Sequence, residues 1–480
     1  MTTKEARSRP APSLRAGTEI EIGFTDLLAN GQAVGRAGGM VVFCFGPLPQ
    51  ERALVRIAAI KQKYAVGDML ELLVASPERA TPFCKVFGIC GGCQVQHLSY
   101  TGQLAWKRTV VRNALERIGG FAGIDVLEPI GMAEPRNYRN KMSLVVEHAT
   151  GSRPQAGDEK IAPTLGFYQQ RSHDVVAIDE CPIVAPQLNE YIAVLNRARK
   201  EEATAPAFFD ARHLVARSAR ATGQGVLTIT SAEASKSADR AAPALFKLLP
   251  NAVGITNSFD LTSENAIMGR RQNVLVGEAA IEEEMEGVRY RVSGESFFQV
   301  NVEIVQRIFD FIRPELTCPQ AIVDLYCGAG TFSLFFAKHG STVFGIEESA
   351  QAIAEAQANA DLNGMQSSVH FRAGRVEEAV RMPDARAALR DAEIVFLDPP
   401  RKGSDERTLG AIAAAGAPRI WYLSCDPATL ARDLKFLAAN GYQLELVQPF
   451  DMFPQTGHIE ALAMLRCTGE AAGYGDGRAA

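Results

Sequence analysis

Short apolar runs separated by glycine and proline turns fill the first part of the chain. From Gly17 to about Ser76 they read IEIGFTD, GQAVGRAGG, MVVFCFG, ALVRIAAIKQKYAVG and MLELLVAS. Short β-rich runs at this spacing predict a small five-stranded barrel of the kind that binds oligonucleotides. A small β domain without a ligand is the alternative. Residues 1 to about 16 precede the pattern and are predicted to be a tail.

From about residue 295 the pattern changes to strands that alternate with helices. The run IVDLYCGAG predicts a buried strand that enters a glycine turn, and TFSLFFAKHG predicts a helix ended by Gly340. The order repeats in STVFGIEES and AQAIAEAQANADLNG and continues through VHFRAG, AEIVFLDPPRKG, RIWYLSCDP and YQLELVQPFDMFPQTGHIEALAMLR. This alternation predicts a mostly parallel sheet with helices on both faces.

The chain of 480 residues therefore divides into three predicted domains. We predict an oligonucleotide-binding-like β barrel at 17–77 and an α+β central domain at 78–290, which includes a helix near 101–118. A Rossmann-like α/β domain is predicted at 291–469. The overall fold class is α/β with an added all-β domain.

Composition and charge limit the partners and the cellular compartment that we expect for this chain. The formal net charge is −5, so any nucleic-acid contact needs a local basic face. No run of 18 apolar residues is present, and the first residues lack the apolar core of a secretory signal, so no membrane contact is expected. We expect a cytoplasmic monomer in a reducing compartment, where clustered cysteines serve metal binding or catalysis more often than disulfides.

The first turn of the C-terminal domain is a candidate cofactor site. The glycines of Asp324–Gly330 let the backbone turn sharply beside a ligand at the carboxyl ends of the strands. Glu347 ends the next strand, where a carboxylate can accept hydrogen bonds from ribose hydroxyls. Ser333 replaces the third glycine of GxGxxG, which favours S-adenosylmethionine over NAD. A tight turn beside a solvated glutamate is the alternative.

Further chemistry-bearing residues lie at later strand ends. Asp398 follows the apolar strand EIVFL, and the two prolines after it are typical of an active-site loop. Cys425 ends the strand IWYLS; a buried structural cysteine is the alternative, but a thiolate at the sheet's ligand crevice can attack an electrophilic ring carbon. Glu460, before the last apolar strand, is the candidate base, and His458 is its rival.

A cysteine cluster lies in the Gly-rich loop PFCKVFGICGGC. Cys84, Cys90 and Cys93 have the spacing C-x5-C-x2-C, which predicts metal binding. Cys181, which a proline follows, is the candidate fourth ligand. Four thiolates can hold zinc or an iron–sulfur cluster, and the spacing does not decide between them. The spacing differs from the CxxxCxxC of radical S-adenosylmethionine enzymes, which disfavours a radical mechanism.

Together these motifs resemble the RNA uracil-5-methyltransferase family, specifically the 23S ribosomal RNA branch that carries a TRAM domain and a [4Fe-4S] cluster. The resemblance runs from about residue 17 to 467 and includes the segment YRNKM at 138–142. It implies that the barrel is a TRAM domain and that the C-terminal domain is a class I methyltransferase domain. It implies cofactor contacts for Gln299, in FQVN, and for Tyr326, Glu347 and Asp398.

The resemblance also implies the catalytic roles. It makes Cys425 the nucleophile and Glu460 the proton acceptor, and it makes the metal centre an iron–sulfur cluster held by Cys84, Cys90, Cys93 and Cys181. The chemistry agrees, because carbon 5 of uracil is a poor nucleophile until a thiolate adds at carbon 6. The base then removes the proton from carbon 5, and the thiolate leaves.

Two departures from the family pattern bear on the site. Asp426 replaces the Asn of the motif SCNP, and its charge can raise the pKa of the neighbouring thiol. The barrel's GPLPQE differs from the usual ALPGE, which leaves its RNA contacts open. Candidates for phosphate contacts are the basic residues of PRNYRNK and DPPRKG, namely Arg136, Arg139, Lys141, Arg401 and Lys402.

Three other functions stay open beside the predicted ribosomal RNA methylation. Family members with both barrel and cluster can act on transfer RNA. An amino-group methylase would need no nucleophilic cysteine. A non-catalytic RNA-binding assembly factor would use only the barrel and the cluster, although the set of Glu347, Asp398, Cys425 and Glu460 argues against it.

Overall fold

The computed structural model describes residues 14–148, 162–263, 266–316 and 319–469. Residues 1–13 of the predicted tail lie outside these ranges. The chain forms two compact units: one holds the residues up to Gln103 together with Gln455–Gly457, and the other holds the remainder. Among the described residues, no helix is both long and apolar enough to cross a membrane.

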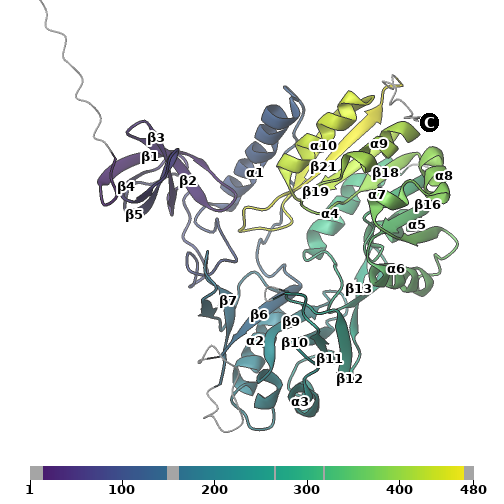
Figure 1. Ribbon diagram of the computed structural model, residues 1–480, viewed down its shortest axis with the longest axis horizontal. Helices are drawn as coiled ribbons and strands as arrows, with labels where there is room; N and C mark the ends of the chain where they lie inside the picture. The colour runs from purple at the N-terminus through teal and green to yellow at the C-terminus, as the bar shows by residue number, and fades with distance from the viewer. Residues whose placement is uncertain (1–13, 149–161, 264–265, 317–318, 470–480) are drawn as a thin grey trace, which may run out of the picture. The chain divides into compact units, whose positions relative to one another are not determined.

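The first unit contains a closed five-stranded barrel, as predicted, with the strand order β1-β2-β3-β5-β4 (Figure 1). Its strands are β1 (Glu19–Leu27), β2 (Gln32–Ala37), β3 (Met40–Phe45), β4 (Arg52–Ile60) and β5 (Tyr64–Val74). Alternate apolar residues such as Phe24 and Val55 are buried and fill the interior. Gly35 allows β1 and β2 to approach, since a Cβ there would lie 2.5 Å from Ile22.

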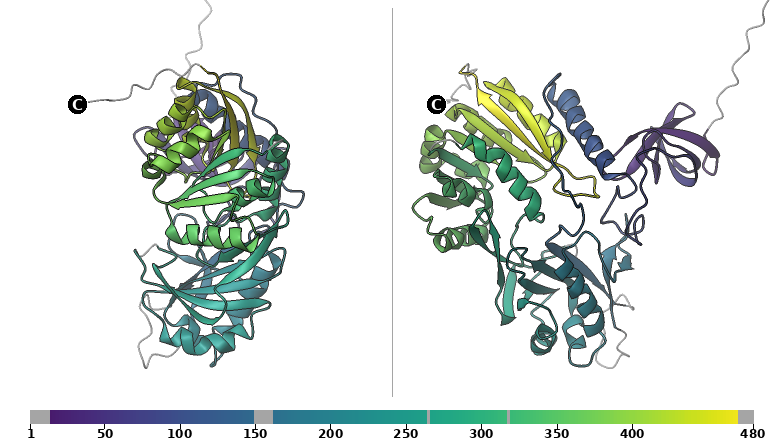
Figure 2. Two further views of the ribbon diagram at one scale, coloured as in Figure 1. Left: turned by 90° about the vertical axis from the view of Figure 1, so that its right-hand side faces the viewer. Right: turned by 180° about the vertical axis from the view of Figure 1, so that it is seen from behind.

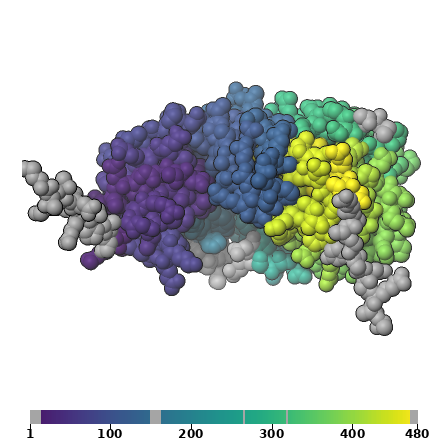
Figure 3. Space-filling view, turned by 90° about the horizontal axis from the view of Figure 1, so that it is seen from above, coloured from purple at the N-terminus to yellow at the C-terminus, as the bar shows by residue number. Residues whose placement is uncertain are grey.

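The second unit begins at Leu104, within helix α1 (Tyr100–Ala114), which continues in a π-helical turn, η1 (Leu115–Gly119). This agrees with the helix predicted near 101–118. Val111 and Leu115 pack into an apolar core with Leu430 and Leu434, which belong to the C-terminal part of the chain. Figure 3 shows the surface of α1, in blue, beside the yellow C-terminal segment. The residues that follow the cysteine loop are therefore part of the core that supports the C-terminal sheet.

A seven-stranded sheet with the order β12-β11-β10-β9-β6-β7-β8 forms the centre of the chain. Its strands are β6 (Lys141–Glu147), β7 (Thr164–Tyr168), β8 (Val175–Ala177), β9 (Ala211–Ser218), β10 (Gly225–Ser231), β11 (Ala252–Phe259) and β12 (Arg271–Gly277). Helices α2 (Pro186–Ala198) and α3 (Lys236–Phe246) pack against it, with the 3-10 turn η2 (Ala205–Phe208) beside α3 (Figure 2). A hairpin of β13 (Ala280–Met285) and β14 (Val288–Ser293) follows.

The C-terminal sheet also has seven strands, in the order β17-β16-β15-β18-β19-β21-β20. Its strands are β15 (Ala321–Leu325), β16 (Thr342–Glu347), β17 (Val369–Ala373), β18 (Ile394–Leu397), β19 (Arg419–Ser424), β20 (Tyr442–Phe450) and β21 (Glu460–Cys467). The first five are parallel, and β21 and β20 are antiparallel, so the predicted mostly parallel sheet is confirmed.

Helices cover both faces of this sheet, as Figures 1 and 2 show. They are α4 (Val302–Ile312), η3 (Arg313–Glu315), α5 (Thr331–Lys338), α6 (Ala350–Leu362), α7 (Val376–Ala379), α8 (Pro383–Asp391), α9 (Glu406–Ala415) and α10 (Pro427–Ala439). Phe396 of β18 contacts the aromatic rings of Phe332 and Phe336 on α5, whereas Val395 and Leu397 join the aliphatic core on the other face. Strands buried on both faces explain the unbroken apolar runs in the sequence.

Candidate active site

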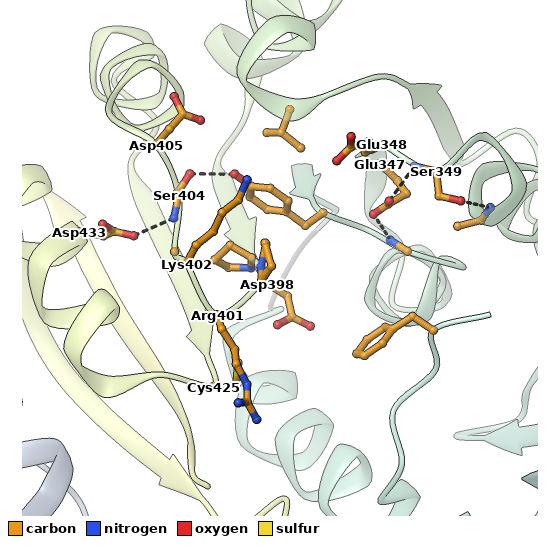
Figure 4. Close-up of a pocket in the computed structure, with 18 of the residues that line it drawn as sticks. Glu347, Glu348, Ser349, Asp398, Arg401, Lys402, Ser404, Asp405, Cys425 and Asp433 are labelled. Carbon is orange, nitrogen blue, oxygen red and sulfur yellow. Dashed lines mark hydrogen bonds between the residues drawn. The ribbon is translucent and has the colours of Figure 1, made fainter. Parts of the chain in front are cut away.

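One cavity of about 1060 Å³ opens at the carboxyl ends of the parallel strands, and all of its lining residues belong to the second unit. Every residue predicted to contact the cofactor or to take part in catalysis lines it, namely Gln299, Tyr326, Glu347, Asp398, Cys425 and Glu460. In Figure 4, Asp398 has Arg401 and Cys425 on one side of it and Glu347 and Ser349 on the other. The fold therefore brings together residues that are far apart in the sequence.

Glu347 is the last residue of β16, and backbone amides fix its carboxylate. Gly328 N–H donates to Oε2 at 3.2 Å, and Ser349 N–H donates to Oε1 at 2.8 Å. Tyr326, which precedes the glycines, has a positive φ of 67° and so turns the chain sharply at the end of β15. Each carboxylate oxygen retains a second lone pair. Glu347 can therefore also accept the hydroxyl groups of a ribose.

Asp398 directly follows β18 and is held by Gln299, whose Nε2 donates to Asp398 Oδ2 at 3.2 Å. Burial raises the pKa of the Asp398 carboxyl to about 7. Burial also raises the pKa of Asp324, to about 7, although the hydroxyl of Ser333 donates to its Oδ2 at 2.5 Å. Asp324 does not line the cavity, but it is buried close enough for the charges of Asp398 and Glu347 to act on it. The carboxyl groups at and behind this end of the cavity favour a ligand that carries a positive charge.

Cys425 directly follows β19, and its side chain is half-buried. Burial, followed by the charges of Glu460 and Asp398, raises the pKa of its thiol to about 12, and Arg401 opposes this shift. The thiol is therefore protonated in the free protein at neutral pH. A cation that enters beside these carboxyl groups would lower the pKa of the thiol and favour the nucleophilic thiolate.

Glu460 is the first residue of β21, and 6% of it is exposed. Burial, followed by the charge of Asp398, raises its pKa well above the ordinary value, and Arg401 opposes that shift. Its Oε2 is buried and has no hydrogen-bond partner among the described residues. An unsatisfied carboxylate oxygen inside a ligand cavity is able to accept a proton from a bound substrate.

His458, the rival base, lies against the guanidinium group of Arg401. Arg401 Nη2 lies 3.2 Å from His458 Nε2 and 3.3 Å from Nδ1. Burial, followed by the charges of Arg401, Lys107 and Arg139, lowers the pKa of His458 to about 4. The imidazole is therefore uncharged and a weak base at neutral pH. The geometry favours Glu460 as the proton acceptor.

Asp426, the departure from the family motif, is the N-cap of α10. Its Oδ1 accepts hydrogen bonds from Ala428 N–H at 2.9 Å and Thr429 N–H at 3.0 Å. The helix dipole stabilises a negative charge at this position. The pKa of Cys425 is instead raised by burial, Glu460 and Asp398. The carboxylate of Asp426 thus serves the helix rather than opposing the thiolate.

Sequence reasoning missed a polar network on the other side of the cavity. Asp433 Oδ2 accepts hydrogen bonds from Tyr422 Oη at 2.6 Å and Ser404 N–H at 2.8 Å, and Ser404 Oγ lies 2.9 Å from Tyr326 Oη. Asp433 and Ser404 both line the cavity (Figure 4). A single carboxylate on the apolar face of helix α10, next to Leu434, was the available signal.

The predicted basic contacts divide into two groups. Arg401 and Lys402 line the cavity, where they can meet a polyanion. Lys141 lies on β6, and burial together with the charge of Arg217 lowers the pKa of its ammonium group to about 7, while Glu295 opposes this shift. Lys141 is half-buried and does not line the cavity, so its contact with phosphate stays a prediction.

The cysteine cluster is split between the two units, because Cys84, Cys90 and Cys93 lie in the first and Cys181 in the second. The described part of the chain contains no group of three or more His, Cys, Asp or Glu side chains placed to hold a metal ion. Cys84 lies close enough to Cys90 that its charge adds to the pKa-raising effect of burial on the Cys90 thiol. Thiol groups of this kind suit a thiophilic metal.

Comparison with known proteins places the chain among RNA methyltransferases. The family model described as tRNA (uracil-5-)-methyltransferase matches residues 166–467. An uncharacterised RNA methyltransferase of Halalkalibacterium halodurans is 37% identical over 93% of this chain and 96% of its own length. One of Thermosynechococcus vestitus is 36% identical over 94% and 98%. The crystal structure of Pyrococcus abyssi tRNA (uracil-54, C5)-methyltransferase with S-adenosyl-L-homocysteine superposes with a TM-score of 0.71 at 26% identity, covering 92% of this chain and 99% of that one.

Proposed function

The chain belongs to the tRNA (uracil-5-)-methyltransferase family and is an RNA methyltransferase, and we propose that it methylates carbon 5 of a uridine through a covalent adduct with Cys425. S-adenosylmethionine supplies an electrophilic methyl group on a positively charged sulfur. The observation that carries the proposal is the shared cavity, which Cys425, Glu460 and Asp398 line together. An amino-group methylase would leave Cys425 and the unsatisfied oxygen of Glu460 without a role.

The methyl donor is proposed to bind at the glycine-turn end of the cavity. Glu347 accepts the ribose hydroxyls, and Tyr326 and Gln299 form the neighbouring walls. Asp398, with one oxygen already held by Gln299, faces the positive charge of the donor. That charge lies among the carboxyl groups that raise the pKa of the Cys425 thiol, so binding of the donor favours the thiolate.

The thiolate of Cys425 adds to carbon 6 of the uracil ring, and the ring electrons move toward carbon 5 and the neighbouring carbonyl oxygen. Carbon 5 takes the methyl group, and the broken bond leaves its electron pair on the donor sulfur. Glu460 then removes the proton from carbon 5, the double bond to carbon 6 reforms, and the thiolate leaves. The uridine gains a methyl group and loses a proton.

The proposed substrate is structured RNA, with 23S ribosomal RNA as the first choice and transfer RNA as the alternative. A uracil in folded RNA is stacked, so it must be flipped out of its helix to reach Cys425. Arg401 and Lys402 at the cavity are proposed to contact phosphates. Transfer RNA is the alternative substrate because the Pyrococcus abyssi relative methylates it, as its name states.

Mass mapping of 5-methyluridine tests both the reaction and the substrate. Ribosomal and transfer RNA from cells with and without the gene would be digested and compared. Loss of one 5-methyluridine in 23S RNA supports the proposal, and loss of one in transfer RNA moves the substrate to that class. If no 5-methyluridine is lost anywhere, the proposed reaction is wrong and the non-catalytic assembly factor becomes the better account.

We further propose that the barrel is a TRAM domain that binds RNA and that the four predicted cysteines hold a [4Fe-4S] cluster. The support is the clustered, half-buried thiols of the loop and the family's motif spacing. Anaerobic purification followed by iron, sulfide and zinc analysis of the wild type and of Cys84→Ser and Cys181→Ser tests this. Iron and sulfide that both variants lose support the cluster; zinc in their place would make it a structural zinc site.

A further inference from the structure

The loop that joins β20 to β21 leads to Glu460 and contributes Phe453 and His458 to the cavity. It has no helix or strand of its own between residues 451 and 459. Buried side chains hold three successive carbonyl oxygens of this loop: Asn301 Nδ2 donates to Met452 O, Lys107 Nζ to Phe453 O and Tyr138 Oη to Pro454 O, each at 3.1 Å. Three donors from separate segments thus fix the backbone just before the catalytic carboxylate.

The segment that supplies Tyr138 also holds the opposite wall of the cavity. Asn140 Nδ2 donates to the carbonyl of Gln299 at 3.0 Å, and Asn140 N–H donates to the carbonyl of Val300 at 3.0 Å. Gln299 in turn donates to Asp398 at 3.2 Å. Asn301, two residues after Gln299, links this wall to the loop, because its side chain donates to the carbonyl of Met452. The segments at 138–140, 299–301 and 452–454 are therefore linked pairwise by side-chain bonds to backbone.

The side chains that make these hydrogen bonds are shielded from water. Tyr138 is 7% exposed, Asn140 is 5% exposed and Asn301 is fully buried, so water does not compete for their bonds. The donors are amide groups and a phenol hydroxyl. Together, these hydrogen bonds hold the wall that faces the methyl donor at a fixed place relative to the loop that ends in Glu460.

We propose that Tyr138 and Asn140, in the segment YRNK, are positioning residues that set the proton acceptor Glu460 relative to Gln299 and Asp398. Neither side chain lines the cavity, so both act through the residues whose backbone they hold. The assignment rests on the proposed function, because it takes Glu460 as the group that removes the proton from carbon 5. A displaced Glu460 slows that step more than the methyl transfer before it, so the methylated covalent adduct accumulates.

Tyr138→Phe removes only the hydroxyl that holds Pro454 and keeps the ring. Tyr442→Phe is the matched control, because Tyr442 is also buried and its hydroxyl donates to a backbone carbonyl, that of Ala417, at 2.9 Å. Neither Tyr442 nor Ala417 lines the cavity. Both substitutions remove one buried hydrogen bond to backbone, so both should lower the melting temperature to a similar extent.

The assay follows 5-methyluridine formation by the intact purified protein on total RNA from cells that lack the gene. The covalent RNA–protein adduct is quantified in the same samples on denaturing gels. We expect turnover about threefold to tenfold lower in Tyr138→Phe, from the loss of one hydrogen bond expressed in the transition state, with a higher steady-state fraction of adduct. Tyr442→Phe should match the wild type in both.

The outcomes separate the two proposals. If the wild type makes 5-methyluridine but Tyr138→Phe matches Tyr442→Phe in turnover and adduct, the positioning role is wrong. A lower turnover without more adduct also overturns it, because the hydroxyl would then serve another step. Asn140→Ala gives an independent check: combined with Tyr138→Phe it should cost less than the product of the two single effects, whereas multiplicative losses would mean that the two residues are not linked. A wild type without 5-methyluridine overturns the proposed function itself.

Discussion

Replacement of Glu460 by glutamine should change two properties of the site in opposite directions. The substitution keeps the size of the side chain and removes its charge and its ability to accept the carbon-5 proton. General-base catalysis contributes about 10²-fold to 10⁴-fold, so 5-methyluridine formation should fall by that amount and the covalent RNA adduct should accumulate. At the same time, Cys425 should become more reactive, because Glu460 is the foremost charge that raises the pKa of its thiol.

The size of the second effect follows from the thiol pKa of about 12. At pH 8, a thiol with this pKa is almost wholly protonated, and each unit by which the pKa falls increases the thiolate fraction about tenfold. Burial is the largest cause of the shift and stays in place, so Glu460→Gln recovers only the part that the carboxylate supplies. We therefore expect alkylation of Cys425 to become faster, by up to about tenfold for each unit recovered.

The measurement is the rate of Cys425 alkylation by iodoacetamide at pH 8, read by peptide mass mapping, beside turnover. Glu393→Gln is the control: this exposed glutamate just before β18 does not line the cavity. It should match the wild type in both assays. If Glu460→Gln retains full turnover, the base lies elsewhere. If its Cys425 is alkylated no faster than in the wild type, the charge of Glu460 does not control the thiol.

Three further substitutions test the surroundings of the site. Asp426→Asn should leave turnover within about twofold, because asparagine caps a helix as well as aspartate does; a large gain in activity would mean that Asp426 does oppose the thiolate. Asp324→Asn should raise the melting temperature relative to the wild type more at pH 8.5 than at pH 5. The carboxyl loses stabilising effect as the pH rises from its ordinary pKa of 3.8 to the raised pKa of about 7, and the part of that range above pH 5 is worth about 3 kcal/mol. An equal difference at both pH values would contradict this reasoning. Lys107→Met should cost about 3–5 kcal/mol in thermal unfolding, because Asp451, at 2.5 Å from Lys107 Nζ, would keep a buried charge without its partner; adding Asp451→Asn should restore part of the loss.

Much of the architecture could be predicted from the sequence because it depends on local patterns. The unbroken apolar run before Asp398 and the glycine turn after Asp324 indicate parallel strands that end at ligand-binding loops. Carboxyl ends of parallel strands meet at one edge of a sheet, so the prediction that Glu347, Asp398 and Cys425 share a crevice needed no tertiary information. The cavity that they line in the structure confirms that they are neighbours, while their roles stay proposals.

The direction of each polar side chain was decided only by the tertiary structure. Adjacent sequence places Asp426 beside Cys425, yet its carboxylate turns to the N-terminus of α10. Lys141 is part of a basic segment in the sequence, yet on β6 it is half-buried and does not line the cavity. The bond between Tyr138 and Pro454 joins residues that are 316 positions apart. Such contacts depend on which segments the fold packs together, and a local pattern of apolar and polar residues carries no information about that choice.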